Sequence, residues 1–367
     1  MVNIKSYLLD KIIFPKRLII DKPGIIYSET FKRYSNKISS KRRLCLDFED
    51  MVANLQLETE KIFGKEETSE IFYRLGKDEG ASNILIAGNK KPPLFLIEFI
   101  LHILFKDMGG WLGLSLKEID LNKKRIILEY NNILVSRKVR DHSLLIGCFS
   151  GILSFLLGEN IEGIAKPKEY SKKGFYIFDK KLENRYIQDI NLLKPARDYE
   201  KLNFPKTEET KNKPCFKDFV KFQKLNISPK GRIYFLGNPL FWSTSKFFNN
   251  LANYFEKRNK KEIFRKIVLK NTTKISEKIL GNQEMEKDKI KLIENMLCVF
   301  GWGIPEIKKM KNEIFVTINY PQINRYKPIY EALVINGYLN YVYKKDFRAY
   351  QIEKKIERQK IIIKYKI

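Results

Sequence analysis

The two halves of this chain repeat one another at an offset of about 190 residues, close to half of its 367 residues. The segment "ISSKRRLCL" (38–46) returns as "ISPKGRIYF" (227–235), and "EIFYRLGKDEG" (70–80) returns as "EIFRKIVLKNT" (262–272). Further pairs follow in the same order: 96–113 with 292–305, 124–130 with 312–320, 151–157 with 337–343, and 174–179 with 359–365. An ordered series of this kind predicts two diverged copies of one domain.

The segment between the copies has the composition of a linker. Residues 180–216 are rich in charge, contain three prolines and show no sustained hydrophobic period. We therefore predict a first domain over residues 1–181, a linker over 182–213 and a second domain over 214–367.

Each copy has the pattern of a mixed α+β domain. An apolar strand is followed by three helices, a strand of alternating character, a long apolar helix and a closing pair of strands. The expected helices cover 51–62, 67–86, 94–105 and a stretch beginning near His142 in the first copy, and 247–255 and 290–300 in the second. This order predicts antiparallel sheets with helices packed on one side.

The charge of the chain favours a polyanionic partner. Its 70 Lys and Arg outnumber 43 Asp and Glu, for a net charge of +27. A lysine-rich composition accounts for part of this excess, but such compositions usually raise Glu alongside Lys. The candidate anion- or nucleic-acid-binding residues are Lys41, Arg42, Arg43, Arg74, Arg258, Lys260, Lys261, Arg265, Lys354, Lys355 and Arg358.

Aromatic residues interleave the last two basic segments. They are Phe255, Phe264, Phe347, Tyr350 and Tyr365. Basic and aromatic residues together suit phosphate neutralisation and base stacking. The alternative is a solvated face whose aromatic side chains point inward, and no established nucleic-acid-binding motif decides between the two.

Nothing in the sequence predicts export or a membrane span. The four cysteines lie far apart without metal-site or disulfide spacing, which fits a reducing cytoplasm. The N-terminus has no signal-peptide pattern. Two apolar stretches, 92–105 and 144–158, are shorter than the roughly 18 uncharged residues that a span requires. A cytoplasmic protein without a transmembrane segment is expected.

The end of the first copy resembles a known family. The segment "GCFSGILSFLLGENIEG" (147–163) is followed by two short strands, in a domain that starts "RLCLDF" and continues through "YRLGKDEG". This pattern resembles the 4-vinyl reductase domain, also called hydrocarbon-binding, whose wider relatives are heme-based NO-sensing domains and TRAPP tethering subunits. The resemblance covers 42–179 and, more faintly, 231–366.

The resemblance implies the NO-signalling/Golgi-transport ligand-binding type of fold, a small hydrophobic ligand held between helices and sheet, and a dimer. Two copies in one chain would then form an intrachain pseudo-dimer. Family members commonly carry two cysteines around the closing strands, whereas residues 165–178 and 350–365 have none. No metal or redox role is therefore inherited, and no cofactor beyond a small hydrophobic ligand is predicted.

Candidate pocket residues lie on the apolar helices. Glu98 and His102 are four residues apart, on one helical face, and offer a polar anchor for a ligand; a carboxylate facing solvent or a basic strand is the alternative. The tryptophans that lie beside glycines could form a lid over a ligand pocket, or they could simply pack in the core. The glycines within helices would allow either close packing of helices or room for a ligand. The other candidates are Trp111, Gly147, Gly151, Glu294, Cys298, Trp302 and Gly337.

Catalysis has little support in this sequence. The chain has two histidines, and no nucleophile lies near a base at local spacing. We expect a non-catalytic binding protein for a small hydrophobic molecule, with further self-association open. The alternative is a nucleic-acid- or ribosome-binding protein that uses the same fold as a rigid basic scaffold. An enzyme acting on a hydrophobic substrate ranks third.

Overall fold

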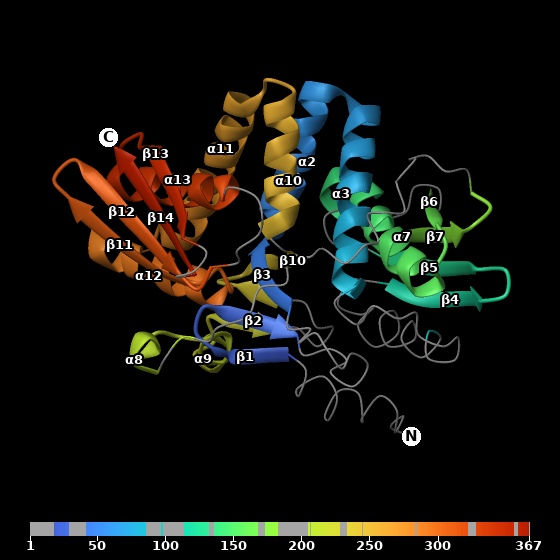
Figure 1. Ribbon diagram of the computed structural model, residues 1–367, viewed down its shortest axis with the longest axis horizontal. Coiled ribbons are helices and arrows are strands. Elements are labelled where there is room, and N and C mark those ends of the chain that lie inside the picture. Colours follow the sequence, from blue (N-terminus) through green and yellow to red (C-terminus); the bar gives the residue numbers. More distant parts are fainter. Residues whose placement is uncertain are drawn as a thin grey trace.

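A six-stranded antiparallel sheet built from both halves lies at the centre of the molecule (Figure 1). The computed structural model describes residues 18–28, 42–85, 97, 114–131, 136–167, 173–182, 205, 207–227, 233–243, 245–282, 285–321, 328–355 and 359–366. The strand order is β1-β2-β3-β10-β9-β8. The strands are β1 (Leu18–Lys22), β2 (Ile25–Ser28), β3 (Arg42–Phe48), β8 (Leu225–Ile227), β9 (Ile233–Phe235) and β10 (Asn238–Ser243).

The two halves meet where β3 pairs with β10. Leu46 lies opposite Trp242, and Cys45 lies opposite Ser243. Each half therefore contributes a three-stranded meander to one continuous sheet. The apolar alternation of these strands buries Leu46, Phe48 and Leu240 against the helices above.

The helices that follow the central strands exchange partners across the halves. In the first half these are α2 (Glu49–Phe63) and α3 (Lys65–Leu85), and in the second α10 (Ser245–Lys257) and α11 (Lys261–Leu280). Helix α2 contacts α11, and α10 contacts α3 (Figure 1). Phe72 of α3 packs against Phe247 of α10, and Phe63 at the end of α2 packs against Tyr254 and Phe255 of α10. Each half thus completes the packing of the other.

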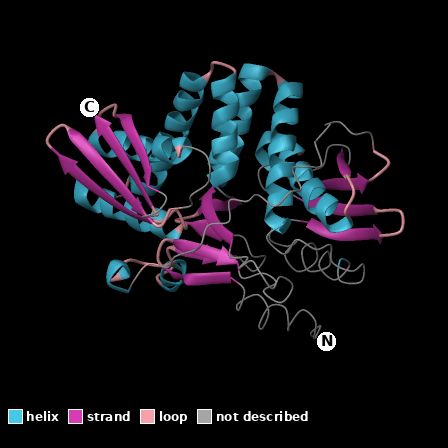
Figure 2. Ribbon diagram, in the orientation of Figure 1, coloured by secondary structure: helices cyan, strands magenta, loops and turns pink. Residues whose placement is uncertain are grey.

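Two four-stranded antiparallel sheets stand at opposite ends of the molecule (Figures 1 and 2). The first has the order β4-β5-β7-β6 and the second the order β11-β12-β14-β13, so their connectivity is the same. The strands are β4 (Leu114–Asp120), β5 (Arg125–Asn131), β6 (Glu162–Pro167), β7 (Lys173–Asp179), β11 (Ile304–Met310), β12 (Glu313–Asn319), β13 (Arg348–Lys355) and β14 (Lys360–Lys366).

Equivalent helices join the strands of these sheets. Helix α7 (Ser143–Leu157) connects β5 to β6, and α13 (Ile329–Tyr343) connects β12 to β13. Helix α12 (Glu286–Val299) precedes β11, while α6 (Ser136–Val139), α8 (Thr207–Thr210) and α9 (Phe216–Lys221) are short. The buried residues of β12 and β14 alternate with half-buried ones, so one face of the second sheet packs on helices and the other faces outward.

The predicted α+β class is confirmed, with helices and antiparallel sheets throughout the described residues. One matched pair falls on strands that do not correspond: residues 38–46 include β3, whereas 227–235 end in β9. The strand that pairs with β3 and leads into the first helix of its half is β10. Strands β9 and β10 form a hairpin of similar apolar content, and the sequence match selected the wrong one.

The remaining expected elements lie close to the observed ones. The expected helix 290–300 is α12, whereas the expected helix 94–105 lies outside the described residues except for the helical Ile97. Helix α8 falls inside the predicted linker. The larger hydrophobic core contains residues of both halves, and a smaller core lies between α7 and the first sheet. Among the described helices, none combines the length and apolar character needed to cross a bilayer.

Candidate functional site

Four glycines bring α3 and α7 into backbone contact. A Cβ atom added to Gly80 would lie 1.9 Å from the carbonyl oxygen of Cys148, and one added to Gly151 would lie 2.1 Å from that of Lys77. Gly76 and Gly147 are equally close to the opposite helix. These glycines therefore serve close helix packing, as one of the two sequence alternatives held, and leave no ligand space between the helices.

The equivalent pair of helices in the second half is packed differently. A Cβ atom on Gly337 would lie 2.5 Å from Cβ of Thr272, which is a side-chain contact. The segment "YRLGKDEG" (73–80) of the first half lies inside α3. Its two glycines, spaced four residues apart, face α7.

A buried polar cluster lies beside the glycine contact. Lys77 Nζ is 2.7 Å from a carboxylate oxygen of Glu162 and donates to Asn160 Oδ1 at 2.7 Å. The Tyr73 hydroxyl donates to the same carboxylate, and its oxygen lies 3.0 Å from Ser150 Oγ, within hydrogen-bond distance. Burial lowers the pKa of Lys77 and raises that of Tyr73. Sequence reasoning missed this cluster.

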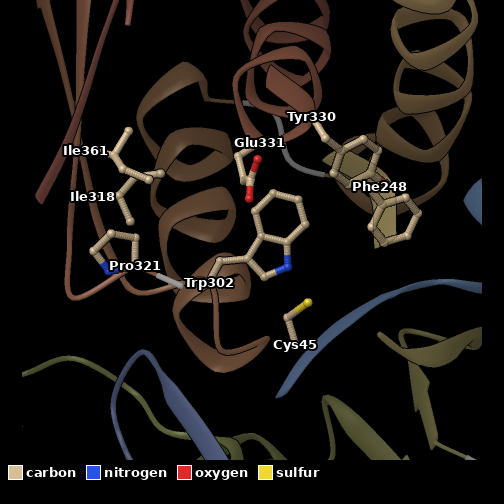
Figure 3. Close-up of a pocket in the computed structure, with 8 residues that line it drawn as sticks. All are labelled: Cys45, Phe248, Trp302, Ile318, Pro321, Tyr330, Glu331 and Ile361. Atoms are coloured by element: carbon tan, nitrogen blue, oxygen red, sulfur yellow. The ribbon is translucent and has the colours of Figure 1, made fainter. Parts of the chain in front are cut away.

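A small cavity lies at the junction of the two halves (Figure 3). Its volume is about 10 Å³, close to the minimum for one water molecule. Apolar side chains form most of the wall, and Glu331 and the Cys45 thiol supply polar groups. The lining residues are Cys45, Phe248, Trp302, Ile318, Pro321, Tyr330, Glu331 and Ile361.

Two buried carboxyl groups, Asp47 and the cavity-lining Glu331, have hydrogen-bond partners beside this cavity. The Tyr330 hydroxyl donates to Asp47 Oδ2 at 2.5 Å, and Phe48 N–H donates to Asp47 Oδ1 at 2.7 Å. Asn249 Nδ2 donates to both carboxylate oxygens of Glu331. Burial raises the pKa of Asp47 to about 7 and raises that of Tyr330 well above its ordinary value. The Tyr330–Asp47 hydrogen bond crosses from α13 of the second half to β3 of the first, whereas Asn249 and Glu331 both belong to the second half.

The Cys45 thiol is not poised for chemistry. It donates to the carbonyl oxygen of Ser243 at 3.3 Å, and burial raises its pKa. The thiolate is the nucleophilic form of cysteine, so this environment suppresses reactivity.

Asp47 makes the stability of the fold depend on pH. Its carboxyl group has an ordinary pKa of 3.8 and a folded pKa of about 7, so folding favours the protonated form. The contribution of Asp47 is fully present below pH 3.8 and is lost as pH rises toward 7. We expect the Asp47→Asn variant to gain stability relative to wild type across this window. Urea unfolding at several pH values checks this, and a constant difference between the two proteins would contradict it.

The structure separates the candidate pocket residues. Ile307 N–H donates to Glu294 Oε1 at 2.8 Å, and the Cys298 thiol donates to the Pro214 carbonyl at 3.3 Å. Burial raises the pKa of Cys298 to about 12. Trp302 lines the cavity and donates its indole N–H to the Leu46 carbonyl at 3.0 Å. Glu98, His102 and Trp111 lie outside the described residues.

Basic and aromatic side chains gather on the outer face of the second sheet. In the strand register, Lys308, Phe315 and Lys364 are neighbours, and Lys364 Nζ lies 5.7 Å from the centre of the Phe315 ring. Tyr350, half exposed at a bulge of β13, donates to Glu313 Oε1. The charged residues of this face are Glu306, Lys308, Glu313, Arg348, Glu353, Lys355, Lys360, Lys364 and Lys366.

The corresponding face of the first sheet has balanced charge. Its basic residues are Lys117, Arg125, Lys166 and Lys173, and its acidic residues are Glu118, Asp120, Glu129 and Asp179. On the second sheet, Lys308 and Lys355 pair with Glu306 and Glu353. The excess positive charge of that sheet therefore lies on β14 and the start of β13.

Five of the nine predicted anion-binding residues in the described ranges engage carboxylates instead. Arg74 pairs with Glu70, Arg258 with Glu67, Lys261 with Glu256, Arg265 with Glu262 and Asp346, and Lys355 with Glu353. Lys260 Nζ lies 5.9 Å from the centre of the Phe63 ring. Lys354 and Lys355 lie on β13, Arg42 and Arg43 on β3, and Lys41 and Arg358 outside the described residues.

Arg74 and Arg258 share an open cleft of about 660 Å³ between α3 and α10. Three carboxylates from the first two turns of α3 line it as well: Glu66, Glu67 and Glu70. The carboxylates outnumber the guanidinium groups, so the cleft is unsuited to an anion.

The interleaved aromatic residues divide between core and surface. Phe255, Phe264, Phe347 and Tyr365 are buried, whereas Tyr350 is 50% exposed. The inward alternative thus holds for four of the five. Phe315, Lys360, Lys364 and Lys366 were not among the candidates, although alternation in 360–366 was a usable signal.

No protein family model matches the sequence, and no curated protein shows significant similarity to it.

Within the described ranges, no group of three or more His, Cys, Asp or Glu side chains is arranged to hold a metal ion. His142 Nδ1 lies 2.6 Å from the Tyr176 hydroxyl, and burial lowers the pKa of the His142 imidazole.

Proposed function

We propose that this chain is a non-catalytic nucleic-acid-binding scaffold made of two diverged copies of a 4-vinyl-reductase-like domain. The shared connectivity of the two end sheets supports the duplication. The central sheet, with one meander from each half, and the exchanged helix contacts support an intrachain pseudo-dimer.

The observation that carries the function is the outer face of the second sheet. Lys364 and Lys366 on β14 lie beside Arg348 on β13, while Phe315 and Tyr350 flank this basic row. Lysine and arginine neutralise phosphates, and exposed aromatic rings stack on unpaired bases. A single strand laid across the face would meet both kinds of group.

The comparison between the two sheets supports a specific role for this face. Both sheets have the same connectivity, yet only the second carries excess positive charge on its outer side. A general lysine bias would raise the charge of both faces alike. The difference therefore favours a polyanion partner for the second sheet.

The small size of the cavity at the junction of the two halves supports nucleic-acid binding over binding of a hydrophobic ligand. The cavity at the junction has room for about one water molecule, far less than the 300–1,000 Å³ typical of ligand sites. The apolar wall, with Glu331 and Cys45 on either side of Trp302, keeps a small hydrophobic molecule as a second candidate, provided that Trp302 and its neighbours move aside (Figure 3).

Fluorescence anisotropy with a labelled mixed-sequence single-stranded oligonucleotide tests the proposal. Lys364→Glu/Lys366→Glu is expected to weaken binding at least tenfold and to flatten its salt dependence. Phe315→Ala/Tyr350→Ala is expected to weaken binding while leaving the salt dependence unchanged, because stacking is not ionic.

The matched control is Lys166→Glu/Lys173→Glu, which makes the same charge change on the outer face of the first sheet. It should retain near wild-type binding. Equal losses in both charge variants, or none in either, would contradict the assignment of this face. A bound mass of a few hundred daltons in native mass spectrometry, removed by organic solvent, would favour the ligand candidate instead.

A further inference from the structure

An exposed apolar corner lies at one edge of the central sheet. Eight large hydrophobic side chains are exposed in the described part of the chain, and four of them lie on α9, at its C-cap, on β8 and in the β9–β10 turn. They are Val220, Phe222, Ile227 and Leu236, with exposures of 36%, 64%, 46% and 45%. We call these four residues, with Lys217, Lys221 and Lys224, the α9 corner.

Contacts with β9 and the β9–β10 turn hold the α9 corner in place. Phe219 and Phe235 are buried and stack with ring centres 6.0 Å apart, which fixes α9 on β9. Leu236 N–H donates to the Lys224 carbonyl oxygen at 3.1 Å, which joins the hairpin turn to the end of α9. The exposed side chains are therefore presented by an ordered surface.

Leu236 has a conformation that does not suit leucine. Phe235 pairs with Asn238, and the two turn residues Leu236 and Gly237 have φ values of 46° and 77°. Such turns favour Asn or Gly at the position of Leu236, because a branched side chain is strained at positive φ. The turn itself does not account for an exposed leucine at this position, whereas an external apolar contact would.

Positive charge surrounds the apolar side chains of the corner. Lys217, Lys221 and Lys224 are exposed, and Lys224 Nζ lies 5.4 Å from the centre of the Phe219 ring. The carboxylate of this helix, Asp218, accepts from Cys215 N–H at 2.9 Å, at the buried start of α9. The corner therefore combines an apolar tip with a basic rim.

We propose that the α9 corner docks on an anionic lipid surface. Phe222 and Leu236 would enter the boundary between headgroups and acyl chains, and the three lysines would contact anionic headgroups. Phe222 and Leu236 stand close together, because the Leu236–Lys224 hydrogen bond places the turn beside the end of α9. The inference is independent of the nucleic-acid proposal, since it uses the edge of the central sheet instead of the outer face of the second sheet (Figure 1).

Vesicle flotation with the full chain tests this docking. Wild type should float with phosphatidylcholine vesicles that contain phosphatidylserine and remain in solution with phosphatidylcholine alone. Phe222→Ser/Leu236→Asn should lower the bound fraction at least tenfold, and asparagine suits the turn, so folding is preserved. Lys221→Glu/Lys224→Glu should lose binding as well.

Met285→Ser removes an equally exposed apolar side chain elsewhere and should float like wild type. Lys364→Glu/Lys366→Glu should also retain most vesicle binding, which separates this test from that of the nucleic-acid face. Docking on lipid is overturned if wild type ignores anionic vesicles, or if the corner variants float normally. It is equally overturned if those variants alter only the oligomeric state or oligonucleotide binding.

Discussion

Replacing Gly151 with alanine is expected to lower the free energy of unfolding by about 2–3 kcal/mol. The added methyl group would lie 2.1 Å from the Lys77 carbonyl oxygen and 2.7 Å from the Ala81 backbone nitrogen. Backbone atoms have no rotamer to change, so α3 and α7 must move apart along their whole contact. The helix-propensity gain of alanine over glycine, about 1 kcal/mol, is smaller than this cost. Urea unfolding followed by circular dichroism measures the difference.

Gly337→Ala is the matched control in the second half. Its methyl group would meet the side chain of Thr272, where α11 and α13 share a single glycine contact. We expect a smaller loss there than for Gly151→Ala. A Gly151→Ala protein as stable as wild type would show that the two helices are not held at backbone contact.

Replacing Lys77 with methionine is expected to cost about 3–5 kcal/mol of unfolding free energy. Lys77 and Glu162 are 5% and 3% exposed, and their charged atoms are 2.7 Å apart. Methionine fills much the same volume but leaves the Glu162 carboxylate without its cation. The Tyr73 hydroxyl and Asn160 amide still donate to that carboxylate, but neither neutralises it. Thermal and urea unfolding would report the loss.

The double variant Lys77→Met/Glu162→Gln distinguishes charge from packing. It removes both charges and keeps similar volumes, so it should recover most of the lost stability. If the double variant is as unstable as the single one, the lysine stem, not the ion pair, would be responsible.

The repeating order of elements was predictable because it rests on local patterns. Helical periodicity placed α2, α10 and α12 within a few residues, and the match of 151–157 to 337–343 falls on equivalent helices, α7 and α13. The central sheet was not predicted. Its strands are short, and the pairing of β3 with β10 joins segments nearly 200 residues apart, which no local pattern reports.

In the candidate site too, features that rest on local patterns were predictable, and features that rest on contacts between distant segments were not. Gly147 and Gly151 were recognised, but their partners Gly76 and Gly80 on α3 were not, although both pairs share a spacing of four. The ion pair of Lys77 with Glu162 joins a helix to a distant strand and has no sequence signature. Basic segments were found by composition, whereas only the strand register shows that Lys364 and Lys366 share a face with Phe315.

The continuous central sheet also dictates an order of events during synthesis. Strand β3 emerges from the ribosome long before β10, and Cys45 lies 198 residues before its partner Ser243. Until β10 has been synthesised, β3 is an unpaired edge of the sheet. Helix α2 likewise remains uncovered until α11 is available to pack on it. Closing so long a loop makes this pairing a late and slow step. The nascent first half is therefore the stage at which the chain is most exposed to aggregation and most dependent on chaperones.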